Sequence, residues 1–541
     1  MAYTAPQPGR FVWLLEVQFA GQVYRWATEA IDLLKSDGSR LSYEGGLDVE
    51  LDEDLALFDD APQPASVSFR GLPMRDDLTV FSARGATFRG NPGELSILRA
   101  GDLWEQRHVR VSGTVRGAAY GAHPRPVAFT LEGRPFDDSA RILSPRAKVT
   151  LETWPDAPSG SLGRFYPVPF GTPGVYREVD GADGRTFGSP VIKVDETTTQ
   201  AIVADGEVSA STVQIIRADE PDPAYASDSL SISTTLDGLG RLVSVVRLSS
   251  STLIGFADGS EFYARWDDGP ALIDDDRNPV IGAGDLARWA LRRTNLGINT
   301  GAVQAARPRM NQIKVSGYID DGEAGAWELV FREINPLLLI SWVRGPDGLE
   351  PVWWDPDLVE ADTQFALEHG RNCYLASDLI VEPMTTPINQ IDLGFAVRAD
   401  TGQPRRRLMI TGDPSPPYVT RGNDVFSTAY SRASLTDYGP GSESIESIFL
   451  YDVDSAAIYL ERAVRVRGYL WQTFEVELDV EDWRIKQRDP PRLGLQGVLT
   501  VAHLRMTDTP VVLVGLSWSN DRAVARVVRI PDFLRESAPA G

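Results

Sequence analysis

The sequence predicts a mainly β protein with a few helices, an α+β chain divided among several domains. Short runs rich in Val, Thr, Ile and Tyr recur along almost its whole length, separated by Gly, Pro or Asp. This spacing is typical of strands joined by turns, whereas apolar residues repeat at helical spacing in only a few segments. Apolar residues make up 42% and charged residues 24% of the 541 positions, the balance of a protein that folds around its own cores. At this length we expect roughly three or four domains.

The first domain is expected over residues 1–140. Strands over 11–20 and 23–28 form a predicted hairpin, with a turn at Gly21 and Gln22 between them. Further strands over 104–115 and 127–133 supply enough elements for a small closed barrel.

An acidic stretch lies within this first domain, where every charge between residues 44 and 60 is negative. The stretch is a candidate channel or intersubunit face, which would be formed by Glu44, Asp48, Glu50, Asp52, Glu53 and Asp54. A solvated loop at the edge of a sheet explains the same pattern, and both interpretations stay open here.

Residues 141–270 are predicted as an inserted β-rich domain. Prolines and glycines near its start favour an extended loop over a ladder interior. The later strands are expected over 201–205, 213–217, 229–234, 242–248 and 261–266. Polar turns and a lack of catalytic residues suit a surface domain.

Residues 271–385 are predicted as a small α/β domain. Its first helix is expected over 285–293, capped by Asp285 and ended by Gly297. A strand is expected next, over residues 307–320.

A second helix of this domain is indicated by an apolar stripe of Trp327, Val330, Phe331 and Ile334. We expect Asn335-Pro336 to stop it, because the residue before a proline disfavours the helical region. A hairpin over 337–354 completes the domain.

Residues 386–541 are predicted as a C-terminal barrel-like domain. Asp454 is expected to cap a helix whose buried stripe comprises Ala456, Tyr459, Leu460, Ala463 and Val464. Four strands are expected after it, over 473–480, 497–502, 511–516 and 523–530.

A basic patch formed by Arg405, Arg406 and Arg407 stands out near the start of this domain. An intersubunit contact with an acidic face such as 44–60 is one interpretation, and a solvated strand end is the other.

The sequence at the joints of these elements resembles the tail hub proteins of long-tailed bacteriophages and of the gene transfer agents derived from them. The first resembling set lies in the α/β domain: residues 285–291 with Arg293, then 308–313, 317–320, 327–328, 345–349 and 352–353. The second is the N-terminal strand pair followed by residues 43–47, and the third is 429–439 with 445–452.

The resemblance implies a structural virion protein at the tail tip, in which each chain carries two similar barrels. A homotrimer would present six barrels to a sixfold tail tube, adapt it to a threefold tip and form the channel for genome ejection. The implied partners are a distal tail protein on the side of the N-terminal barrel, a tip or fibre protein, the tape-measure protein as a further candidate, and DNA that passes without specific binding. No repeat is visible in the sequence itself.

Bulk charge agrees with a protein that does not hold nucleic acid. The formal net charge is −23 and the isoelectric point is near 4.7, which argues against binding through phosphates. Solubility and a DNA-repelling channel wall both explain this acidity. The single cysteine, Cys373, excludes an intrachain disulfide framework. With no signal-peptide pattern and no apolar run of roughly 18 residues, we expect no membrane segment and assembly in the host cytoplasm.

Motifs for catalysis, cofactors and metals fail in context. Residues 282–287 match a dinucleotide fingerprint without a strand before them, and a calcium-like loop from Asp274 has Pro279 where glycine is required. His369 and Cys373 make one ligand pair without a second. We therefore expect no enzyme, cofactor or metal. The alternatives are a glycan-binding or glycoside-cleaving β protein, supported by 13 Trp and 76 acidic residues, and a tail-fibre adhesin whose residues 141–270 bind a glycan.

Overall fold

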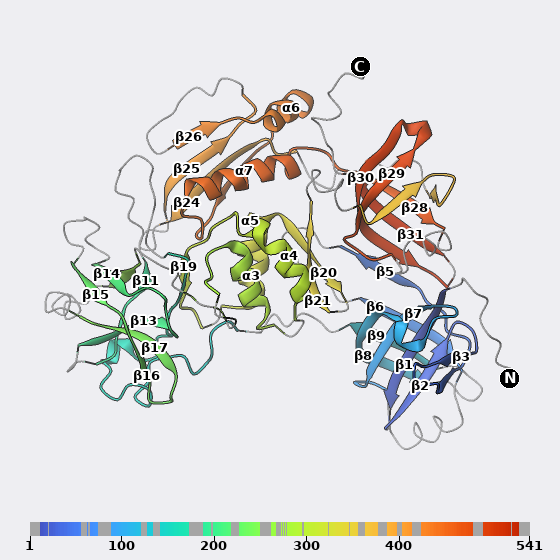
Figure 1. Ribbon diagram of the computed structural model, residues 1–541, viewed down its shortest axis with the longest axis horizontal. Coiled ribbons are helices and arrows are strands. Elements are labelled where there is room, and N and C mark those ends of the chain that lie inside the picture. Colours follow the sequence, from blue (N-terminus) through green and yellow to red (C-terminus); the bar gives the residue numbers. More distant parts are fainter. Residues whose placement is uncertain are drawn as a thin grey trace.

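The structure is a computed structural model. It describes residues 11–19, 21–55, 62, 65–73, 88–120, 127–133, 141–172, 188–195, 199–217, 227–248, 261–266, 272, 274, 276, 278–294, 297–322, 324–345, 347–354, 363–376, 387–397, 403–413, 423–479, 491–520 and 522–529. The described chain is mainly β with a few helices, as predicted. Figure 1 shows the N-terminal and C-terminal β sheets side by side at one end, a helical centre, and further sheets at the other end.

The N-terminal sheet is antiparallel and its strands run in the order β2-β1-β7-β8-β9-β6. These strands are β1 Phe11–Phe19, β2 Gln22–Ala27, β6 Ser66–Leu72, β7 Pro92–Arg99, β8 His108–Tyr120 and β9 Val127–Gly133. Alternate residues of β1, among them Trp13, Leu15 and Val17, face one interior. The side chain of Trp26 in β2 donates to the carbonyl of Pro73, just past β6, at 3.1 Å. The two ends of the sheet therefore approach each other, as in a barrel.

The outer face of β1 is covered by a small hairpin. β3 Ile31–Leu34 pairs with β4 Arg40–Tyr43. Val12 and Leu14, which lie on the side of β1 that faces away from the barrel interior, pack against this hairpin. The expected N-terminal hairpin is confirmed in type and position.

The C-terminal sheet has the path β22-β29-β30-β31-β28-β23. Its strands are β22 Phe365–Glu368, β23 Cys373–Leu375, β28 Gln472–Leu478, β29 Gln496–Val501, β30 Met506–Trp518 and β31 Ala523–Arg529. An isolated bridge between His369 and Cys373 joins the two ends of this path. The interior of this sheet and that of the N-terminal sheet belong to one apolar cluster.

The centre combines two segments that lie far apart in sequence around one core. The first contains α3 Ala283–Leu291, α4 Thr300–Met310, the π-helix η4 Glu328–Ile334, α5 Asn335–Leu338, and the hairpin of β20 Ile340–Gly345 with β21 Gly348–Trp353. The second is the sheet β26-β25-β24-β27, formed by Asn423–Phe426, Pro404–Ile410, Gln390–Val397 and Ser442–Glu446, together with α6 Ala429–Tyr438 and α7 Val453–Arg467.

The expected β-rich segment forms two four-stranded sheets, β11-β18-β14-β15 and β12-β13-β17-β16. Their strands are β11 Ser189–Pro190, β12 Ile192–Lys193, β13 Gln200–Asp205, β14 Thr212–Arg217, β15 Ser227–Ser231, β16 Ser233–Leu236, β17 Leu242–Arg247 and β18 Phe262–Arg265. The chain leaves the centre after β10 Val168–Phe170, which pairs with β19 Gly317–Ile319. It returns at Val280, whose carbonyl accepts from the amide of Gly171 at 2.9 Å.

Two predictions about helices in the centre were wrong. Residues 307–310, expected in a strand, end helix α4, which Asn299 caps by accepting from the amide of Ala302 at 3.1 Å. Asn335-Pro336 does not stop the second helix, because Pro336 lies in the first turn of α5, where its missing N–H is not needed. The helix ends instead at Leu339, in the left-handed region with φ 53°.

Two predicted caps were also wrong. Gly282 occupies the N-cap position of α3, and Asp285 lies buried in its first turn, where it pairs with Arg307 at 2.5 Å. Asp452 caps α7 by accepting from the amide of Ser455 at 2.8 Å, two residues before the predicted Asp454. Asp285 and Asp454 both lie in the first turn, where a negative charge interacts favourably with the positive end of the helix dipole. The N-cap is set by the residue at which the backbone enters the helix, which is Gly282 in α3 and Asp452 in α7.

Elements from three of the four domain ranges expected from the sequence join a sheet or core of another range. β22 and β23, from the range 271–385, pair with the C-terminal sheet, and β24 to β27, from the range 386–541, share the core of the central helices. β5 Leu51–Asp54, from the range 1–140, pairs with β30. The physical reason is that each of these short strands completes a sheet or core that it cannot form with its sequence neighbours.

Candidate functional site

The acidic stretch lies at the junction of the N-terminal and C-terminal sheets. Asp52, Glu53 and Asp54 belong to β5, which is antiparallel to the last residues of β30. Asp54 contacts Arg526, and Asp52 accepts from the hydroxyl of Ser517 at 2.6 Å. Glu53 contacts Arg110 of β8 and accepts from the indole of Trp518 at 3.2 Å.

The remaining acidic candidates lie just before β5. Asp48 accepts from the side-chain amide of Asn520 at 2.8 Å. Glu50 is exposed and Glu44 is half-buried, with the carbonyl of Glu44 accepting from the amide of Ala27 at 2.7 Å. Much of the stretch therefore holds the two sheets together, and its role as a channel or intersubunit face stays a prediction.

The basic patch lies on β25, among acidic residues of the neighbouring strands. Arg406 lies 3.6 Å from Asp424, and Arg407 pairs with Asp392 at 2.7 Å and with Glu446 at 3.3 Å. Arg405 is also in β25, but its side chain lies outside the described residues. An intersubunit contact of this patch stays a prediction.

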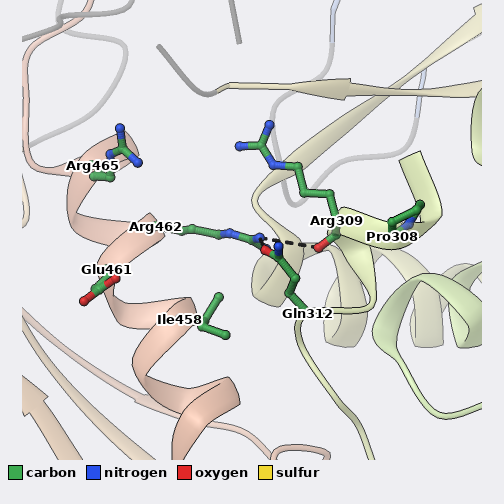
Figure 2. Close-up of a pocket in the computed structure, with 7 residues that line it drawn as sticks. All are labelled: Pro308, Arg309, Gln312, Ile458, Glu461, Arg462 and Arg465. Atoms are coloured by element: carbon green, nitrogen blue, oxygen red, sulfur yellow. Dashed lines mark hydrogen bonds between the residues drawn. The ribbon is translucent and has the colours of Figure 1, made fainter. Parts of the chain in front are cut away.

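A groove between α4 and α7 is a site that the sequence interpretation missed. Its volume is about 500 Å³ and it is lined by Pro308, Arg309, Gln312, Ile458, Glu461, Arg462 and Arg465. Figure 2 shows the side chains of α7 on one side and those from the end of α4 on the other. Three half-buried arginine residues thus line one groove of a strongly acidic protein.

The arginines of this groove are held in place by specific contacts. The guanidinium of Arg309 lies over the ring of Trp353, 4.3 Å from its centroid, and that of Arg465 lies 4.6 Å from the centroid of Tyr430. Arg465 also donates to the Tyr430 hydroxyl at 3.1 Å. Arg462 donates to the carbonyl of Arg309 at 3.4 Å and contacts the side chain of Gln312 (Figure 2).

One signal for half of this groove is present in the sequence. The buried stripe of α7 was predicted correctly, and the opposite face of the same helix carries Ile458, Glu461, Arg462 and Arg465 at spacings of three and four residues. Nothing in the sequence places α4, some 150 residues earlier, against that face.

The structure brings together two histidines that are far apart in sequence. The rings of His369 and His503 have centroids 5.2 Å apart, and Nδ1 of His369 accepts from the amide of Leu375 at 3.2 Å. Burial raises the pKa of the neighbouring Cys373 thiol to about 12, which favours the neutral thiol over the thiolate that binds metals. Among the described residues, no three His, Cys, Asp or Glu side chains gather as metal ligands.

The loop that resembles a calcium site is closed by an arginine. One oxygen of the buried Asp274 carboxylate accepts from the amides of Asp276 and Asn278, and the other contacts Arg288 of α3. These contacts use the carboxylate to fix the loop against the helix. No helix in the described part of the chain is long and apolar enough to span a membrane.

Comparison with known proteins identifies only structural neighbours. No protein-family model matches the chain, and no curated protein matches it. A tail protein from Neisseria meningitidis is 10% identical over 96% of each chain, with a TM-score of 0.35. A prophage 43 kDa tail protein from Shewanella oneidensis is 8% identical, over 95% of this chain and 96% of that one, with a TM-score of 0.33.

A chain in the virion of a native gene transfer agent is also similar, at 16% identity. The aligned region covers 52% of this chain and 82% of that chain, with a TM-score of 0.18. These three neighbours are named as tail proteins or as part of a virion.

Proposed function

We propose that this chain is a structural virion protein of a phage-type tail, and that it acts there as the trimeric hub at the tail tip. One observation carries the proposal. The N-terminal and C-terminal sheets have the same cyclic strand order, although their sequences show no repeat.

The matching order is found by numbering the strands of each sheet along the chain. The N-terminal sheet, β2-β1-β7-β8-β9-β6, reads second, first, fourth, fifth, sixth, third. The C-terminal sheet, β22-β29-β30-β31-β28-β23, reads first, fourth, fifth, sixth, third, second. On a closed ring these orders are identical, and the two paths differ in where the ring is opened.

Strand directions agree except at the first strand. β1 is antiparallel to its neighbour β7, whereas β22 is parallel to its neighbour β29. The second to sixth strands point the same way in both rings. Such agreement in order and direction favours an internal duplication over two unrelated barrels.

A duplicated barrel suits a hub that joins two symmetries. Three chains related by a threefold axis would present six similar barrels, which a sixfold tube could contact in equivalent ways. In this proposal a distal tail protein binds the barrels, a tip or fibre protein binds the opposite face, and the tape-measure protein is a candidate neighbour. DNA passes along the axis without specific binding, where the acidic excess opposes adhesion.

The alternative of glycan binding receives little support from the tryptophans. Sugar rings stack on exposed aromatic faces, and every tryptophan among the described residues is buried or half-buried. Two of the half-buried ones, Trp104 and Trp353, already have a guanidinium group over the ring.

Mass measurement of the purified chain, followed by electron microscopy of its particles, tests the proposed hub. We expect a trimer, or a ring formed on addition of the distal tail protein, with six similar lobes around an opening. A chain that stays monomeric with that partner present, or a multimer without a central opening, would contradict the proposal.

A further inference from the structure

We infer that the groove between α4 and α7 is a binding site for a carboxylate-rich segment of a neighbouring protein subunit. This inference rests on the proposed function for the presence of a neighbour in an assembly. The site itself is argued from the three arginines and their supports.

The chemistry of the groove selects an anion. Arg309, Arg462 and Arg465 line it from two helices, and all three residues are half-buried. Partial burial lowers the local dielectric constant, so a charge at this position is felt more strongly than on an open surface. The protein carries a net charge of −23, so three arginines in one groove make a local positive region on a molecule that is negative overall.

The aromatic supports preorganise the site. The guanidinium carbons of Arg309 and Arg465 lie over the rings of Trp353 and Tyr430, 4.3 and 4.6 Å from the ring centroids. A guanidinium group presents its N–H groups in a planar fork, which matches the two oxygens of a carboxylate. Because rings restrain these long side chains, less conformational entropy is lost when a ligand binds.

The other lining residues favour a peptide carboxylate over a phosphate polymer. Ile458 and Pro308 offer apolar contact to the stem of an acidic side chain, and the exposed Glu461 repels a doubly charged phosphate group more strongly than a single carboxylate. A volume of about 500 Å³ accommodates a few side chains. The acidity of the whole molecule also opposes the approach of a long nucleic acid.

Peptide binding to the full-length chain tests this site. The probe is a fluorescein-labelled hexapeptide of alternating Glu and Leu, and its matched control has Gln in place of Glu. By fluorescence anisotropy in low salt, we expect the Glu peptide to bind at least tenfold more tightly than the Gln peptide. Arg309→Gln with Arg462→Gln should weaken binding at least tenfold, and Arg462→Lys should weaken it less, because lysine keeps the charge and loses the fork.

Arg332→Gln is the control for charge, since Arg332 is 66% exposed on η4 and does not line the groove. It should leave peptide binding unchanged, and circular dichroism should show every variant folded. If a groove variant fails to fold, two other results test the inference. One is the salt dependence of Glu-peptide affinity for the wild-type chain, and the other is the affinity of the Arg462→Lys variant. Absence of wild-type binding, or equal weakening by Arg332→Gln, overturns the inference.

Competition distinguishes the ligand classes. Inorganic phosphate at the same ionic strength should displace the peptide poorly, and a single-stranded DNA oligonucleotide should not displace it. Displacement by DNA, with loss of DNA binding in the groove variants, overturns the peptide assignment in favour of nucleic acid. The peptide experiment uses the isolated chain, so its failure is distinct from failure of the trimer test.

Discussion

The contact between Glu53 and Arg110 provides a sharp test of how the two β sheets are held together. Glu53 lies in β5, which adds to the C-terminal sheet, and Arg110 lies in β8 of the N-terminal sheet. Their side chains are 15% and 7% exposed. Glu53 also accepts from the indole of Trp518, and Arg110 donates to the carbonyl of Pro491 at 3.0 Å.

Substituting Glu53 by alanine leaves a buried guanidinium group without its carboxylate. Removal of one partner from a buried ion pair costs about 3–5 kcal/mol of unfolding free energy, and low exposure means little of this cost is screened by solvent. If the two sheets unfold as one unit of roughly 200 residues, the melting temperature should fall by roughly 6–20 °C. Calorimetry or thermal circular dichroism of the full chain measures the shift.

Two controls separate this effect from a general loss of charge. Glu132→Ala breaks the Arg116–Glu132 pair of the N-terminal sheet, which also contains Arg110. The side chains of Arg116 and Glu132 are 57% and 36% exposed, so this change should lower the unfolding free energy by at most about 1 kcal/mol. The double substitution of Glu53 and Arg110 by methionine should recover most of the stability, because no buried charge remains. A shift for Glu53→Ala no larger than for Glu132→Ala would refute the reasoning and return Glu53 to the candidates for an open acidic face.

Three further predictions concern a desolvated carboxyl group, a buried ion pair and a close backbone contact. Asp320 is exposed, but neighbouring protein atoms desolvate its carboxyl group and raise its pKa. The unfolded chain therefore ionises first, and stability should fall as pH rises from the ordinary carboxyl range through that raised pKa. Asp320→Asn should remove this fall in a series of melting temperatures. Arg288→Ala strands the buried carboxylate of Asp274 and should cost about 3–5 kcal/mol in denaturant unfolding, whereas Arg292→Ala, at a pair with 24% and 47% exposure, should cost under about 1 kcal/mol. Gly113→Ala would place a Cβ 1.8 Å from the carbonyl of Glu132 and should prevent β8–β9 pairing, seen as loss of soluble folded protein, while Gly160→Ala meets nothing within 4 Å and should fold normally.

Local patterns predicted most strands and the buried face of α7. The turn at Gly21 and Gln22 located the hairpin of β1 and β2, whereas both sides of β1 are apolar over residues 11–15 because each side packs into a separate core. The stripe of Tyr459, Leu460, Ala463 and Val464 is likewise a property of helical spacing, and all four side chains are buried. Where the prediction was wrong, as at Pro336 and the two caps, the decisive factor was the path of the chain into the helix.

The pairing between distant segments could not be predicted from local sequence patterns. The acidic residues of β5 read as a solvated loop or an intersubunit face, and their pairing with β30 became visible only in the structure. The groove between α4 and α7 has the same origin, because Arg309 and Arg462 gain a common site only when the two helices pack.

By itself the sequence determined the class of the protein, mainly β and acidic, and the inward face of its regular elements, since side-chain periodicity and charge are local properties. The tertiary structure decided which strands close each ring, that the two rings share one order, and that three arginines meet in a groove. These features depend on contacts between residues up to hundreds of positions apart. The free energy of such a contact depends on both segments together, so it cannot be inferred from the sequence of either one.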